Sequence, residues 1–174
     1  MATLYDISFP VIIKVLRTTV SVLTKGEEYA NQNGISTKEL LTARIYDDML
    51  PLTTQVLILV KLSRQAIKTL TGATPAEVQF EDKPLEELFT LLDDTLKDLS
   101  AVEKRSVDEM EGTDVNFPMG AKTMKSTAPD YIRGFIVPNM YFHLSITYAL
   151  LRKQGVPLGK RDYLSEFAQN LVEV

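Results

Sequence analysis

The fold of the chain is decided by residues 127–155, which read TAPDYIRGFIVPNMYFHLSITYALLRKQG. The apolar side chains of this stretch recur at steps of three and four residues, as they do on one face of an α-helix. The opening TAPD at 127–130 is typical of a helix start, and RKQG at 152–155 is typical of a helix end. The stretch therefore predicts one long amphipathic helix.

Three other segments show the same periodicity and also predict long helices. They lie at about 9–33, 46–70 and 82–99. Asn33-Gly34 ends the first segment, because either residue can adopt the left-handed conformation at a helix end. Four long amphipathic helices predict an all-α, up-and-down four-helix bundle formed by a single domain, residues 1–174.

A short stretch before the last helix lacks the helical period. Val115, Phe117 and Met119 alternate with other residues there, and Gly120-Ala121 offers a turn. This alternation predicts a small β-hairpin, which Pro118 confines to a sheet edge because proline donates no ladder hydrogen bond.

The composition narrows the classes of function. The chain has 174 residues, no cysteine, a single histidine and a net charge of −4. Without cysteine there is no disulfide, thiolate metal site or thiol nucleophile, and one histidine cannot build a two- or three-histidine metal site. The acidic balance argues against nucleic-acid and anionic-membrane partners. Because no basic leader and no bilayer-long apolar run is found, we expect a cytoplasmic protein.

Polar side chains on apolar helix faces indicate a functional site. Asn139 and His143 are four residues apart and share the inward face of the last long helix. On the second helix, the spacing of Asp48 and Gln55 places both on the same face as the apolar residues. Arg44 precedes Asp48 by four residues. Buried polar groups need partners, so these side chains are expected to meet one another, water or a ligand. They predict a small-molecule pocket at one end of the bundle.

Two other interpretations of these residues remain open. One is a satisfied structural network, in which Asp48 caps the second helix and Arg44 binds its carboxylate. The other is a metal site in which water completes the coordination by Asp48 and His143. No metal or other cofactor is expected, because an acid, an amide and one imidazole form a poor zinc site.

If the pocket is catalytic, His143 is the expected general base because its ordinary pKa lies near neutrality. Asp48 would orient the ring, and Tyr131 or Tyr141 would polarise a carbonyl. This chemistry suits an isomerisation, a cyclisation or a dehydration. The residues expected to bind the ligand are Arg44, Gln55, Asn139, Tyr131 and Tyr141.

Several stretches carry a resemblance to a known family. They are NMYFH at 139–143, ALLRKQGVPLGKRDYL at 149–164, AR at 43–44 and DMLPL at 48–52. Together they resemble a microbial domain-of-unknown-function family within the DinB/YfiT-like superfamily of metalloenzymes. The resemblance covers nearly the whole chain, and VPLGKRD at 156–162 is its most specific part.

The resemblance implies a four-helix bundle with one long crossover connection, often as a homodimer. The wider superfamily holds its metal with three histidines, one on the second helix and an HxxxH pair on the fourth. Here the pair reads Asn139-x3-His143, and the second helix offers only Asp48 or Gln55. The metal-dependent activities of the superfamily are therefore not expected in this chain. The alternative function is a non-catalytic structural or interaction protein, a homodimer with a degenerate metal site.

Overall fold

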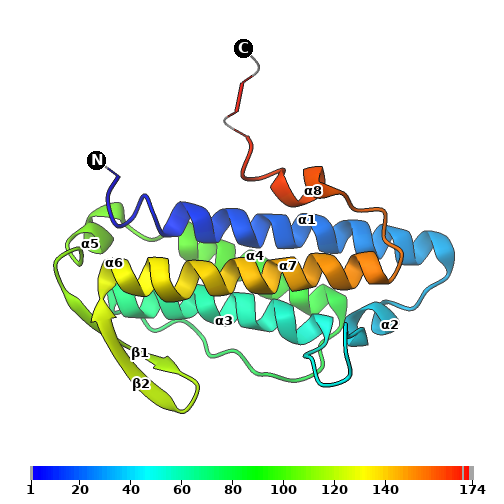
Figure 1. Cartoon of the computed structure of the whole chain (residues 1–174), viewed down its shortest axis with the longest axis horizontal. Helices are drawn as coiled ribbons and strands as arrows, with labels where there is room; N and C mark the ends of the chain where they lie inside the picture. Colours follow the sequence, from blue (N-terminus) through cyan, green and yellow to red (C-terminus); the bar gives the residue numbers. More distant parts are fainter. Residues whose placement is uncertain (1, 170, 173–174) are drawn as a thin grey trace.

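The computed structural model describes residues 2–169, 171 and 172, and these are mostly helical. The four long helices are α1 (Phe9–Asn33), α3 (Leu52–Thr71), α4 (Leu85–Ser100) and α7 (Val137–Lys153) (Figure 1). The shorter elements are α2 (Thr37–Thr42), α5 (Lys104–Asp108), α6 (Ala128–Tyr131), the π-helical turn η1 (Ile132–Ile136) and α8 (Lys160–Leu164). The strands are β1 (Asp114–Met119) and β2 (Lys122–Thr127). Within the described residues, no helix has the length and hydrophobicity that a membrane crossing requires.

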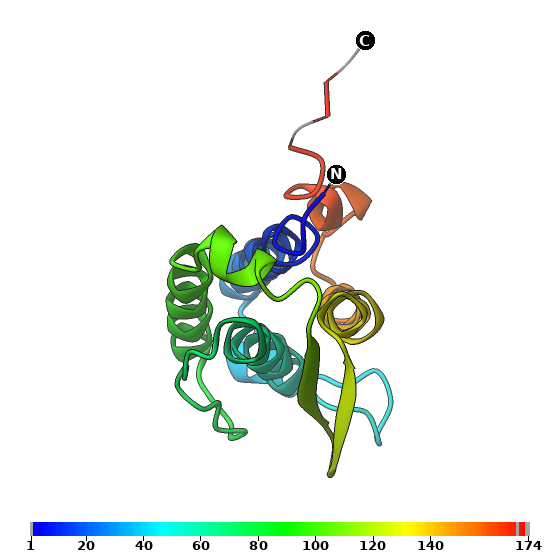
Figure 2. The same cartoon turned by 90° about the vertical axis from the view of Figure 1, so that its left-hand side faces the viewer.

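The four long helices pack around one common core. α1 lies against α4 and α7, and α3 lies against the same two helices, as the end-on view in Figure 2 shows. Fully buried residues come from all four: Phe9, Leu59, Leu88 and Leu144. Each such side chain contributes roughly 1.5–3 kcal/mol by leaving water. This shared core fixes the relative positions of the helices that carry the site residues.

Helices α3 and α4 run in the same direction. Thr53 and Pro84 lie together where the two helices start, and Ile67 and Asp98 lie together near their other ends. Residues 72–84, here called the crossover segment, return along α3 to the start of α4 (Figure 1). Fully extended, this segment reaches about 40 Å, which exceeds the roughly 30 Å length of α3. The strictly alternating up-and-down order is therefore wrong for this pair, and the long crossover agrees with the family resemblance.

The small β-hairpin before the last long helix is confirmed. β1 and β2 pair antiparallel, with Phe117 opposite Met124. Val115 and Phe117 are buried while Asn116 between them is exposed, which is the alternation that the sequence shows. The Phe117 ring packs against that of Tyr131, with ring centroids 4.6 Å apart. This contact anchors the hairpin to α6, and β1 also lies against α3.

The second long helix begins later than its periodicity predicts. The expected start was residue 46, but α3 begins at Leu52, after an extended Pro51. A residue before proline disfavours the helical conformation, so Leu50 cannot continue a helix into Pro51. The loop is held by the Leu52 amide, which donates to the carbonyl of Ala43 at 3.1 Å. Asp48 therefore lies in this loop and not on a helix.

The last long helix contains a π-helical turn, η1, just before Pro138. Proline has no amide hydrogen and disturbs the helical ladder, which accounts for an irregularity at this point. The side-chain amide of Asn139 donates to the carbonyl of Phe135 at 2.6 Å. Asn139 therefore binds its own helix and does not reach across the bundle.

Candidate functional site

Gln55 and His143 form a hydrogen bond between α3 and α7. Gln55 Oε1 lies 2.7 Å from His143 Nδ1, and Gln55 is only 3% exposed. Gln55 Nε2 donates to the carbonyl of Leu50 at 3.0 Å, which fixes the orientation of the amide. Because Oε1 can only accept, Nδ1 carries the hydrogen and Nε2 of the neutral ring keeps its lone pair. The structure thus brings together two of the residues that the sequence singled out.

Burial favours the neutral form of the His143 imidazole. Burial lowers the pKa of His143 below its ordinary value of 6.5. The ring is half-buried, and its neighbour Phe142 packs edge-on with ring centroids 5.2 Å apart. A neutral ring with a fixed tautomer presents a defined proton acceptor at Nε2.

The free energy of unfolding is expected to fall as the pH drops from 7 towards 5. The unfolded chain takes up a proton on His143 near pH 6.5, whereas the folded chain does so only at lower pH. Stability is therefore full above about pH 6.5 and decreases between that value and the lowered folded pKa. Urea unfolding followed by circular dichroism between pH 5 and 7.5 measures this slope.

The variant His143→Asn is the control for this prediction. The side-chain amide of the introduced asparagine can donate to Gln55 Oε1 from a position close to that of the His143 Nδ1 atom. Unlike the imidazole, this amide does not titrate. Since His143 is the single histidine of the chain, the variant should show a flatter profile. An equal slope in both proteins would contradict the assignment to His143.

Asp48, Arg44 and Asn139 do not join the pair formed by Gln55 and His143. Asp48 is exposed in the loop before α3, so the prediction of an inward helical position is wrong. The Arg44 guanidinium donates to the carbonyl of Met49, and no ion pair joins it to Asp48 among the described residues. Asn139 binds its own helix, as described above. The predicted convergence of five polar residues is thus reduced to one pair.

Tyr131 and Tyr141 lie in separate aromatic contacts. Tyr131 is fully buried beside Phe117, and burial raises the pKa of its hydroxyl to about 12. Tyr141 packs against Phe167 beyond α8, with ring centroids 5.8 Å apart, and burial raises its pKa as well. In the described part of the chain neither hydroxyl forms a hydrogen bond with His143. Among the described residues, no contact supports the expected role of either tyrosine in polarising a carbonyl.

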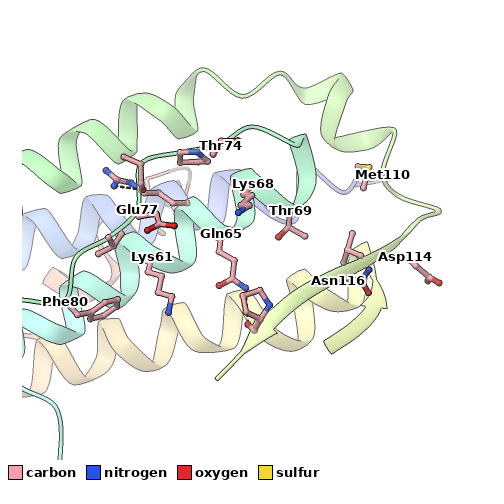
Figure 3. Close-up of a pocket in the computed structure, with 16 residues that line it drawn as sticks. Lys61, Gln65, Lys68, Thr69, Thr74, Glu77, Phe80, Met110, Asp114 and Asn116 are labelled. Carbon is pink, nitrogen blue, oxygen red and sulfur yellow. Dashed lines mark hydrogen bonds between the residues drawn. The ribbon is translucent and has the colours of Figure 1, made fainter. Parts of the chain in front are cut away.

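A large cavity lies elsewhere, between α3, the crossover segment and β1. Its volume is about 780 Å³. Figure 3 shows the α3 side chains Lys61, Gln65, Lys68 and Thr69 between the crossover segment and the hairpin. Apolar side chains also line the cavity, among them Val78, Phe80, Met110, Val115 and Pro118. None of the site residues predicted from the sequence lines this cavity.

Arg64 is the buried charged residue of this cavity. It is 8% exposed. Its Nε donates to Thr95 Oγ1 at 3.2 Å, and its Nη1 donates to the carbonyl of Ala76 at 3.0 Å. Arg64 therefore joins α3 to α4 and to the crossover segment. No carboxylate of the described residues lies within 4.0 Å of its guanidinium.

Sequence reasoning missed this cavity although a signal for it exists. Lys61, Arg64 and Lys68 recur at steps of three and four and lie on one face of α3. Such a face is ordinarily solvated. The crossover segment covers part of it, and its path cannot be predicted because it has neither helical nor strand period.

Comparison with known proteins places the chain in a family. One family, described as a domain of unknown function (DUF1993), matches residues 4–164. The chain belongs to the DUF1993 family. No curated protein matches it.

The solved structures add a similar fold to this DUF1993 assignment. The crystal structure of a DinB family member protein from Shewanella denitrificans superposes with a TM-score of 0.85 at 24% sequence identity. The match covers 98% of this chain and 96% of that chain. At this identity the likeness shows that the two proteins share a fold. Together the two comparisons confirm the resemblance to a domain-of-unknown-function family whose fold is similar to that of a DinB family member.

The residues of this DUF1993 chain do not fit a three-histidine metal site. His143 is the one imidazole, and its Nδ1 hydrogen is bound by Gln55. The amide of Asn139 is engaged with a backbone carbonyl. In the part of the chain that the structure describes, no three histidine or carboxylate side chains cluster with the spacing of metal ligands.

Proposed function

We propose that this DUF1993 protein binds a small organic molecule in the cavity between α3, the crossover segment and β1. The observation that carries the proposal is a cavity of about 780 Å³. This volume falls within the roughly 300–1,000 Å³ that is usual for small-molecule sites. Basic, amide and apolar side chains share the wall, and such a mixture binds the body of a ligand while fixing its orientation. The proposal needs no metal, since the lining offers carboxylates only from Glu77 and Asp114.

Binding to this cavity is tested with the neutral fluorescent probe N-phenyl-1-naphthylamine. The probe is expected to bind the wild-type protein, and Gln65→Trp is expected to weaken binding at least tenfold. Gln65 is half-buried in the cavity wall, and its Nε2 donates to the carbonyl of Pro118 at 3.3 Å. An indole at this position would therefore fill the part of the cavity next to the hairpin.

The matched control carries the same substitution on an exposed part of α1. Gln32→Trp adds an equal indole away from the cavity and should leave the affinity unchanged. If Gln65→Trp binds the probe as tightly as the wild type does, the cavity is not the binding site and the proposal is wrong.

Acid–base chemistry at His143 is a second candidate function, and the neutral ring favours it. Gln55 holds the ring through Nδ1, so Gln55 takes the orienting role that the sequence assigned to Asp48. Nε2 is left to accept a proton from a substrate, as an isomerisation, cyclisation or dehydration requires. His143→Asn removes this acceptor and is the control for any turnover that is found.

Self-association is the remaining candidate, and three exposed apolar side chains favour it. Tyr46, Leu50 and Phe142 are exposed by 71%, 46% and 57%. Tyr46 and Leu50 lie in the loop before α3, and Phe142 lies on α7. Gln55 joins this loop to α7, because it binds both the Leu50 carbonyl and His143. A homodimer through these side chains would make a degenerate metal site part of an interface. Light scattering of the purified protein would show a monomer if they have no such role.

A further inference from the structure

We infer that the cavity between α3, the crossover segment and β1 takes an organic anion, whose acidic group is bound by Arg64. This inference rests on the proposed binding function and adds the chemical class of the ligand. It would place the apolar body of the ligand against the apolar side chains of the cavity and its acidic group against Arg64 on α3.

Among the described residues, no carboxylate forms an ion pair with Arg64. A charged side chain that is buried without a partner of opposite charge is costly. Arg64 is more than nine-tenths buried, and both of its hydrogen-bond acceptors, Thr95 Oγ1 and the Ala76 carbonyl, are neutral. Its Nη2 has no hydrogen-bond partner among the described residues. An incoming anion would supply the missing charge and accept from this free nitrogen.

The guanidinium group also has the right shape for this role. Its planar array of donors matches the paired oxygens of a carboxylate, a sulfonate or a phosphate. Such charge-assisted hydrogen bonds are roughly twice as strong as neutral ones. The geometry therefore favours an anionic ligand over a neutral one of the same size.

The other charges of the cavity give it a positive balance. Lys61 and Lys68 lie on the same face of α3 as Arg64 and are exposed at its rim. The Asp114 carboxylate is 2.8 Å from the Lys125 ammonium and forms an ion pair with it. Glu77, the other carboxylate of the lining, forms no ion pair among the described residues. The positive side chains outnumber this one unpaired acid. Glu77 should oppose an anion, which makes it a useful site for a test.

The ligand should also contain an apolar part. Val78, Phe80, Met110 and Pro118 line the cavity. The Phe80 ring is half-exposed and lies under Lys61, with the ammonium nitrogen 5.3 Å from the ring centroid. An apolar or aromatic body would cover these side chains while the acidic group reaches Arg64. The ligand class is therefore an amphipathic organic anion.

The experiment compares two probes that differ by one sulfonate group. 8-Anilinonaphthalene-1-sulfonate is the anionic counterpart of the neutral N-phenyl-1-naphthylamine. Fluorescence titration of the wild-type protein should give an affinity at least about tenfold higher for the sulfonate, as one hydrogen bond to a charged group predicts. Arg64→Met should remove this preference, and Arg64→Lys should keep part of it because the charge stays but the planar donors are lost.

Arg64 also joins α3, α4 and the crossover segment, so its replacement by methionine can prevent folding. A second variant keeps the test valid in that case. Glu77 is exposed, and Glu77→Gln should raise the affinity for the sulfonate severalfold more than the affinity for the neutral probe. The anion inference is overturned if both probes bind equally well and neither substitution changes the ratio of their affinities. In that case Arg64 only holds the crossover segment in place, and the proposed binding function stands. If neither probe binds, both proposals are overturned.

Discussion

Replacing Phe117 by alanine is expected to lower the free energy of unfolding by about 3 kcal/mol, near the low end for buried phenylalanine. Phe117 is 6% exposed, and its ring packs against those of Tyr131 and Phe135 with centroids 4.6 Å and 4.9 Å away. The substitution leaves a hole between the hairpin and α6. Because β1 forms one wall of the cavity, binding of the neutral probe should weaken as well. Urea unfolding and the fluorescence titration measure the two effects.

Met119→Ala is the control for this prediction on the same strand. Met119 is 44% exposed, so its truncation should change the free energy of unfolding by less than about 0.5 kcal/mol. Equal effects of the two substitutions would mean that the hairpin is not anchored through Phe117.

Replacing Gln55 by leucine is expected to cost about 2 kcal/mol of stability. The change removes the acceptor of His143 Nδ1–H and the donor to the Leu50 carbonyl, and an unpaired buried polar group costs roughly 1–3 kcal/mol. Leucine is apolar and of similar size, so loss of packing contributes little. Urea unfolding at pH 7.5, where His143 is neutral, measures this cost.

A double-mutant cycle isolates the bond between the two side chains. The double variant of Gln55→Leu and His143→Leu has no unpaired imidazole hydrogen, so its cost should be smaller than the sum of the two single costs. Additive costs would show that the contact between Gln55 and His143 contributes nothing to stability.

Much of the fold could be predicted from the sequence because its determinants are local. The periodicity of 127–155 locates the last long helix, and the alternation of Val115 and Phe117 locates the hairpin. The direction of α4 could not be predicted, because it depends on the path of the crossover segment, which has no period of its own. The start of α3 was misplaced because Asp48 fits the helical spacing although Pro51 prevents the helix from extending that far.

The candidate site was predicted in part for a related reason. Gln55 and His143 are polar residues on apolar stripes, and such residues must find partners across the core. Arg64 could not be recognised in this way, since it shares a face with Lys61 and Lys68 that resembles an ordinary solvated surface. Its burial results from the packing of the crossover segment, which is a tertiary effect.

The parallel course of α3 and α4 also has an electrostatic consequence. Each helix carries a partial positive charge at its N-terminus and a partial negative charge at its C-terminus, so like ends of these two macrodipoles adjoin each other. The charged side chains oppose this arrangement. Glu86 and Glu87 lie in the first turn of α4, and Lys68 and Lys97 lie in the last turns of α3 and α4. These side chains offset a repulsion that antiparallel neighbours would not experience.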